Sequence, residues 1–144
     1  MTEIAFHFNA PDKLAYTCRL LRKAVASGAR VVVTASDETL HRLDQILWTY
    51  SATEFLPHCL DTSAAVVLSH SPVVLARTPA QAPHQQVLVN LGDDVPTGFE
   101  RYERLIEVVS RGDDDRAQAR LRWKQYADRG YTLQRHDLVL KEHA

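Results

Sequence analysis

The stretch RVVVTASDETLHRLDQILW, residues 30–48, decides the fold. Residues 30–35 are β-branched and apolar on both faces, which is typical of a central strand that helices cover on both sides. Ser36 or Asp37 then caps a helix. The buried stripe of that helix consists of Leu40, Leu43, Ile46 and Leu47. A strand followed at once by an amphipathic helix indicates an α/β unit.

The residues before this stretch repeat the same arrangement. Residues 4–8 read as a short strand, and residues 9–12 follow as a turn that can cap a helix. The helix ends at Gly28. Its apolar seam is Leu14, Cys18, Leu21 and Val25. Strand, helix, strand and helix at this spacing predict βαβ units and a parallel sheet.

The middle of the chain predicts a loop and further strands. Residues 49–65 read as a long, partly structured loop. Residues 65–70 and 73–76 are short strand patterns, and Pro72 between them indicates a position near a sheet edge. Residues 87–91 predict a buried strand.

The last third predicts two helices. One lies within residues 96–110, and its shared face consists of Phe99, Tyr102, Leu105 and Ile106. The other covers about residues 113–129 and begins in three aspartates, which suit the positive end of the helix dipole. Residues 131–140 read as a closing strand or a tail.

Composition limits the fold and the function. The 144 residues are 45% apolar and 24% charged, with a net charge of −1. We therefore expect one domain over residues 1–144, an α/β fold of three layers with a mostly parallel central sheet flanked by helices and a Rossmann-like topology. The small net charge excludes a general electrostatic binder of DNA or membrane. The two cysteines have no metal-ligand spacing. Residues 1–10 do not read as a signal peptide, and no apolar run approaches the length of a membrane span, so we expect a cytoplasmic protein.

Catalytic and cofactor motifs are absent from the sequence. The turns at residues 9–13 and 34–38 contain no glycine, so we expect no nucleotide, and we expect no other cofactor or metal. Cys18 lies on a buried seam, where a nucleophile is improbable. Asp93 and Asp94 follow a buried strand, at the edge where α/β sheets hold ligands. They fit a solvated turn better than the carboxylate site of a small enzyme.

Trp48 is the first of two aromatic features that are unusual for a monomer. On the helix it falls on the polar side, between His41 and Asp44, with Phe55 and Pro57 a few residues later. Either the following loop curls back and packs Phe55 against Trp48, or the indole anchors a protein partner.

The second feature is a stripe of cations and an aromatic residue on the last helix. Arg116, Arg120 and Trp123 share one face, and Lys124 flanks it. Such a stripe can bind an anion attached to an apolar group, such as the terminal carboxylate of a hydrophobic residue. In the alternative interpretation, Trp123 and Tyr126 face the sheet, and the arginines pair with the aspartates at residues 113–115.

Three stretches resemble the chi subunit family of bacterial DNA polymerase III holoenzyme. They are RVVVTASDETLHRLDQILWTYSATEFLPHCL (30–60), VLVNLGDDVPTGFERYERLIEVVS (87–110) and RLRWKQYADRGYTL (120–133). The most specific pieces are LDxxLW…FxPH and R-x-R-[YW]-K-x-Y, and the resemblance covers essentially the whole chain.

The resemblance implies a non-catalytic adaptor with an α/β fold and no nucleotide. It implies binding to the psi subunit, which links the protein to the clamp-loader complex. The psi-binding surface would contain Trp48 and Phe55, with Pro57 and His58 beside them. No membrane partner is implied.

The resemblance also implies binding to the acidic, phenylalanine-terminated tail of single-stranded DNA-binding protein. Arg120, Trp123 and Lys124 match the tail-binding helix, and Arg116 matches a further basic position. Val109 is the nearest apolar candidate for the pocket floor, because the connection before this helix is shorter than in the best-known form. A direct binder of single-stranded DNA would need a longer basic and aromatic groove than one helix face offers.

Overall fold

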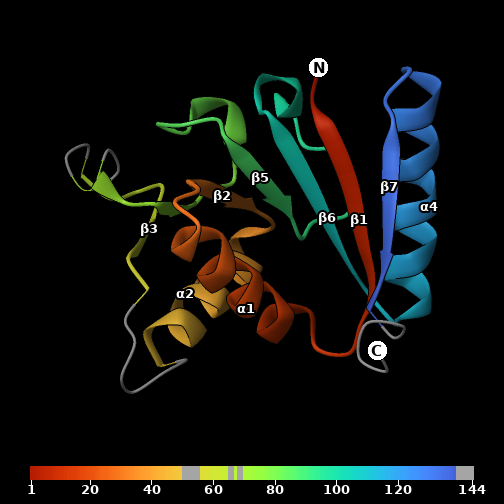
Figure 1. The fold of residues 1–144 in the computed structure, drawn as a ribbon. Helices are drawn as coiled ribbons and strands as arrows, with labels where there is room; N and C mark the ends of the chain where they lie inside the picture. The colour runs from red at the N-terminus through yellow and green to blue at the C-terminus, as the bar shows by residue number, and fades with distance from the viewer. Residues whose placement is uncertain (50–55, 65–66, 68–69, 139–144) are drawn as a thin grey trace.

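A computed structural model of the chain describes residues 1–49, 56–64, 67 and 70–138. It has three layers, with a central sheet of seven parallel strands between helices (Figure 1). The strand order is β3-β4-β2-β5-β6-β1-β7. The strands are β1 Glu3–Ala10, β2 Val31–Thr34, β3 His58–Leu60, β4 Val73–Leu75, β5 Val87–Asn90, β6 Arg104–Ser110 and β7 Leu133–Asp137. The helices are α1 Lys13–Ala26, α2 Asp37–Thr49 and α4 Asp113–Asp128, with 3₁₀ turns η1 Pro79–Gln81 and η2 Phe99–Arg101. The predicted three-layer α/β fold is confirmed.

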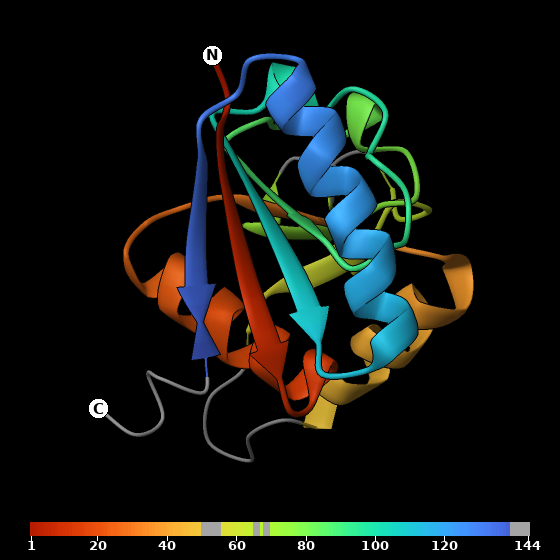
Figure 2. The ribbon, with the colours of Figure 1, turned by 90° about the vertical axis from the view of Figure 1, so that its right-hand side faces the viewer.

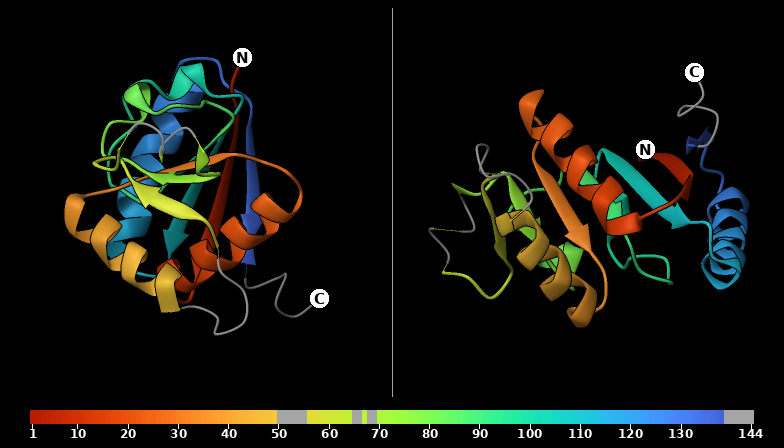
Figure 3. Two further views of the ribbon diagram at one scale, coloured as in Figure 1. Left: turned by 90° about the vertical axis from the view of Figure 1, so that its left-hand side faces the viewer. Right: turned by 90° about the horizontal axis from the view of Figure 1, so that it is seen from below.

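The helices divide between the two faces of the sheet because of the direction in which each connection runs. α1 and α2 lead from β1 to β2 and then to β3, whereas α4 leads from β6 to β7 in the opposite direction along the sheet. Since crossovers between parallel strands are right-handed, opposite directions put the helices on opposite faces. Figures 2 and 3 show α4 on one side of the sheet and α1 with α2 on the other.

The core consists of two apolar clusters, one on each face. Val31 and Val33 of β2 pack under α1 and α2, while Val32 between them belongs to the cluster under α4. All three side chains are at most 1% exposed. This alternation confirms that residues 30–35 form a central strand covered on both faces.

The first two helices begin and end as the sequence predicts. The Asp12 carboxylate accepts a hydrogen bond from the amide of Ala15 at 3.1 Å, and the Ser36 hydroxyl accepts one from the amide of Thr39 at 3.3 Å. Gly28 follows α1 at φ 88°, a left-handed conformation that favours glycine. These caps fix the strand-to-helix turns at the carboxyl ends of β1 and β2.

The prediction of a helix within residues 96–110 is wrong. Only Phe99–Arg101 form a single 3₁₀ turn, and Arg104–Ser110 form the strand β6. Tyr102 and Leu105 do pack together with Phe99, but Ile106 lies on the opposite face of the sheet. β6 is buried on both faces and is apolar apart from Glu107 in its middle, and periodicity cannot distinguish such a short run from a buried helix.

The region between α2 and β5 also differs from the prediction. Val67 and His70 are helical, so the strand predicted over residues 65–70 is wrong at both described positions. β3 lies within the stretch predicted to be a loop. β4 and β7 confirm the strand predicted over residues 73–76 and the closing-strand interpretation of the C-terminal stretch. None of the helices in the described part of the chain has the length and apolar character that a bilayer crossing requires.

Candidate functional site

A pocket of about 330 Å³ lies between α4 and the strands β1, β6 and β7. Figure 2 shows α4 in front of these strands. The pocket is lined by Phe6, Phe8, Val109, Arg116, Ala119, Arg120, Trp123 and Arg135. It therefore brings together four of the five residues predicted to bind an acidic tail. The exception is Lys124, which is exposed and continues the basic stripe of α4 outside the lining.

The floor of this pocket is apolar. Phe6 and Phe8 are alternate residues of β1 and face α4, and Val109 of β6 is 1% exposed beside them. The indole of Trp123 packs against the Phe6 ring with centroids 5.1 Å apart. Trp123 is thus half-buried, with one part of its ring in the core and another part on the pocket.

The walls of the pocket are cationic. Arg116 and Arg120 extend from α4 and Arg135 from β7, and all three are exposed. Within the described residues, no carboxylate forms an ion pair with these three guanidiniums. The alternative interpretation is wrong where it pairs the helix arginines with the aspartates at residues 113–115, since no such pair exists in this part of the chain. Its other half is confirmed, because Trp123 packs against Phe6 of the sheet and Tyr126 is buried in the same cluster.

Asp115 has other partners. Its carboxylate accepts a hydrogen bond from the Ser110 amide at 2.8 Å and forms an ion pair with Lys13 at 3.1 Å. Burial alone would raise the pKa of this carboxyl, but the Ser110 amide and the Lys13 ammonium outweigh burial and hold the pKa below its usual value. The charge of Asp115, one of the three aspartates that start α4, is therefore neutralised away from the pocket.

Arg122, which the sequence analysis did not assign, anchors the inner face of α4. Its guanidinium is 1% exposed and pairs with Glu107 of β6 at 3.1 Å. The same carboxylate accepts hydrogen bonds from Tyr126 at 2.6 Å and from Asn90 of β5 at 3.0 Å. Burial raises the pKa of Glu107, and the Arg122, Tyr126 and Asn90 donors oppose that rise. This network holds α4 against the sheet. The spacing of the arginines in the sequence did not predict that Arg122 would be buried and paired.

The second predicted surface lies where α2 meets β3. Trp48 is 58% exposed, and its ring packs edge-on against the ring of His58, with the two ring centroids 5.1 Å apart. The imidazole is buried; Nδ1 donates to the Leu56 carbonyl at 2.7 Å, and Nε2 lies 3.2 Å from an Asp44 carboxylate oxygen. Pro57 is exposed beside them. Phe55 lies outside the described residues, so the alternative in which it packs against Trp48 stays open and its assignment to this surface stays a prediction.

The carboxylates considered for catalysis form part of a structural turn. Asp93 and Asp94 are exposed, and their backbone carbonyls accept hydrogen bonds from Arg122 at 2.8 Å and Asn90 at 3.1 Å. In the described ranges, no group of three or more His, Cys, Asp or Glu side chains could hold a metal ion. Burial raises the pKa of the Cys18 thiol to about 11, so it is not an activated nucleophile.

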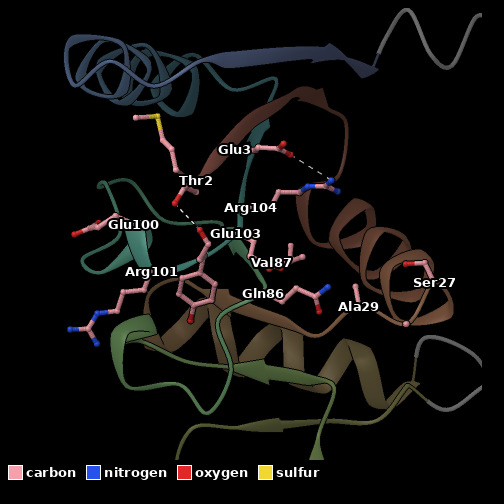
Figure 4. A pocket seen from close by; sticks show the side chains of 13 residues that line it. Thr2, Glu3, Ser27, Ala29, Gln86, Val87, Glu100, Arg101, Glu103 and Arg104 are labelled. Atoms are coloured by element: carbon pink, nitrogen blue, oxygen red, sulfur yellow. Dashed lines mark hydrogen bonds and ion pairs between the residues drawn. The ribbon is translucent and has the colours of Figure 1, made fainter.

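A larger depression of about 580 Å³ lies at the amino ends of β1, β5 and β6, and Figure 4 shows its lining. Glu3 and Arg104 form an ion pair across it at 3.8 Å, and the Thr2 hydroxyl donates to the Tyr102 carbonyl at 2.7 Å. Its polar groups include these internal pairs, and ligands of open α/β sheets bind at the opposite, carboxyl edge. The cationic pocket beside α4 is therefore the stronger candidate.

Comparison with known proteins identifies similar chains over nearly the whole length. The family model described as "DNA polymerase III chi subunit, HolC" matches residues 1–134. The chain is 32% identical over 143 residues to DNA polymerase III subunit chi of Pseudomonas aeruginosa, covering 96% of this chain and 98% of that protein. It is 26% identical over 118 residues to DNA polymerase III subunit chi of Escherichia coli, covering 81% and 79% of the two chains.

Proposed function

The chain belongs to the DNA polymerase III chi subunit family, and from this membership we propose that it tethers the replicase to coated template by binding two partners. Members of the family are accessory subunits of the polymerase, and the chain is an accessory replication subunit rather than a catalytic one. The first proposed partner is the acidic, phenylalanine-terminated tail of single-stranded DNA-binding protein. The second is the psi subunit, through which the chain would join the clamp-loader complex in the cytoplasm.

The observation that carries the tail-binding proposal is the composition of the pocket beside α4. Arg116, Arg120 and Arg135 surround an apolar floor, and no carboxylate of the described residues competes for them. Guanidinium groups bind carboxylates through charge-assisted hydrogen bonds. The aromatic and aliphatic floor offers a surface for one phenyl ring. An acidic peptide that ends in phenylalanine supplies both groups.

The affinity that this arrangement supports is modest. A short disordered tail loses conformational freedom on binding, which leaves about −8 kcal/mol or micromolar affinity. The three arginines are exposed, so their attraction is screened over about 8–10 Å at physiological ionic strength. Binding should therefore weaken as salt is added.

The surface at the end of α2 supports the psi-binding proposal. Trp48 presents most of its indole to solvent, and the buried ring of His58 packs against it edge-on. Tryptophan is enriched among residues that dominate binding energy at protein interfaces. In this proposal Phe55 and Pro57 extend the same apolar surface.

The tail-binding proposal is tested by titrating a fluorescent acidic peptide ending in phenylalanine and following its anisotropy. Arg120→Ala should weaken binding at least several-fold and leave the thermal unfolding temperature unchanged, because the side chain is exposed. The matched control is Arg42→Ala, which removes the same charge from an exposed position on α2 and should bind like the wild type. Equal affinities of the wild type and both variants would contradict the proposal.

The psi-binding proposal is tested by capturing purified psi on immobilised protein. Trp48→Ala should lose psi, retain tail binding and unfold at nearly the wild-type temperature, since the indole is mostly exposed. Arg42→Ala serves again as the control on the same helix. Retention of psi by the Trp48 variant would show that the interface lies elsewhere.

A further inference from the structure

We propose that Arg135 of β7 binds the terminal carboxylate of the peptide, while the arginines of α4 bind acidic side chains that precede it. This inference rests on the proposed tail binding and adds a specificity-determining residue that the basic pattern of the helix does not contain. Arg135 is 15 residues after Arg120 in the chain and on a different element. Both side chains line the same pocket, one from α4 and the other from β7.

Two aromatic rings hold the Arg135 guanidinium over the pocket. The carbon at its centre lies 5.0 Å from the Phe8 ring centroid and 5.9 Å from that of Trp123. Cations are attracted to the faces of aromatic rings, and stacking fixes the guanidinium without using its N–H groups. The side chain is thus positioned before a ligand arrives, which lowers the entropy cost of binding.

The N–H groups of Arg135 remain available to a ligand. No acceptor among the described residues takes a hydrogen bond from this side chain, and no carboxylate pairs with it. Arg116 and Arg120 share this property, whereas two other arginines nearby do not. Arg122 donates to Glu107 and to the Asp93 carbonyl, and Arg111 donates to the Asn9 carbonyl. A held but unsaturated guanidinium in a pocket is suited to bidentate binding of a carboxylate.

The position of Arg135 over the floor favours the terminal carboxylate rather than an acidic side chain. A terminal phenylalanine carries its ring and its carboxylate on the same Cα, so the carboxylate must bind close to where the ring binds. Arg135 is paired in register with Phe6 of the floor and stacks on Phe8. Arg116 and Arg120 lie one helical turn apart along the other wall, where they can follow the preceding residues of the peptide.

The experiment compares two synthetic peptides with the same acidic sequence ending in phenylalanine, one with a free terminal carboxylate and one with a terminal amide. Each is titrated against the full-length wild type, Arg135→Gln and the matched control Arg116→Gln. Both substitutions remove one exposed guanidinium that lines the pocket, so they change the net charge equally. Thermal unfolding of each variant checks that the fold is retained.

We expect Arg135→Gln to lower the affinity for the carboxylate peptide about tenfold and the affinity for the amide peptide less than about twofold. The reason is that only the carboxylate peptide loses a charge-assisted hydrogen-bonded pair. Arg116→Gln should lower the affinity for both peptides by the same factor. Arg135→Lys should restore part of the lost affinity, because the charge is kept and the planar fork is not.

Two results would overturn the inference, and they are distinguishable. If the wild type binds the carboxylate peptide and Arg135→Gln weakens both peptides equally, Arg135 supplies only general positive charge and the proposed function survives. If the wild type binds neither peptide, the proposed function fails and this assignment fails with it.

Discussion

Arg120 and Arg122 lie two residues apart on α4, yet they belong to different environments. Arg120 is exposed on the wall of the pocket, without an ion-pair partner in the described part of the chain. Arg122 is 1% exposed and pairs with Glu107, which is fully buried. Two residues correspond to about 200° around a helix, so adjacent positions of one basic motif point in nearly opposite directions.

The comparison separates two uses of the same side chain. Burying a guanidinium is costly unless its donors are paired, and two acceptors meet Arg122 here. Its Nε donates to the Glu107 carboxylate of β6, and its Nη1 donates to the Asp93 carbonyl in the turn after β5, while Nη2 has no acceptor among the described residues. An exposed guanidinium costs little to leave unpaired and is therefore available to a ligand. On this basis the inner face of α4 sets the position of the helix, and the outer face beside β7 is the proposed binding face.

The largest expected effect comes from breaking the inner face. Arg122→Ala leaves the buried Glu107 carboxylate without its cation and should lower the free energy of unfolding by about 3–5 kcal/mol. Urea denaturation measures the loss. Arg120→Ala, the matched control, should change that free energy by less than about 0.5 kcal/mol.

A double substitution sharpens this contrast. Arg122→Met combined with Glu107→Gln removes both charges and keeps an acceptor for Tyr126 and Asn90, so it should recover a large part of the stability lost by Arg122→Ala. If Arg122→Ala and Arg120→Ala unfold at the same urea concentration, the two faces of α4 do not differ energetically as the contacts indicate.

Trp123 lies on the boundary between the two faces and gives the next largest effect. Trp123→Ala removes half-buried packing against Phe6 and should cost about 2 kcal/mol of stability. The same substitution should also lower the affinity for the tail peptide several-fold, because the indole lines the pocket. Trp123→Tyr keeps an aromatic ring and should restore most of both properties. A variant that loses stability but binds the peptide normally would remove Trp123 from the binding surface.

The sequence predicted the parts of this molecule that depend on local patterns. The cap at Asp12, the central strand at residues 30–35 and the basic stripe of α4 all follow from neighbours within a few residues. The exposure of Trp48 follows from its angle on a helix. Each of these predictions depended only on the residue pattern within a single helix or strand.

The rest depends on contacts between distant segments. β6 carries Glu107 within an apolar run, and only the fold shows that its partners are Asn90, Arg122 and Tyr126. In the same way, the two phenylalanines of the pocket floor come from β1 and its third cation from β7. Strand order and register create these neighbours, and no spacing along the chain specifies them.

A smaller effect is expected from pH, at the point where α4 begins. The pKa of Asp115 is lowered in the folded protein, so its carboxylate contributes stability above the unfolded value of 3.8 and loses that contribution as pH falls through the folded pKa. Asp115→Asn should therefore be less stable than the wild type at pH 7. The difference should shrink as pH falls below 3.8. Urea denaturation at several pH values measures it, and a difference that is constant with pH would contradict the assignment.

The smallest expected effect concerns Lys124, which tests how far the binding face extends. It lies one turn beyond Arg120 on the same stripe, but it is exposed and outside the pocket lining. Its ammonium can attract the acidic peptide only through solvent, where salt screens it. Lys124→Ala should thus lower the affinity for the peptide by about twofold or less at low salt, and at high salt the variant and the wild type should bind the peptide equally. Arg120→Ala should bind the peptide more weakly than the wild type at both salt concentrations, because the guanidinium that it removes borders the apolar floor. If the Lys124 variant loses as much affinity as the Arg120 variant, the peptide runs along the open helix surface and the pocket does not define the site.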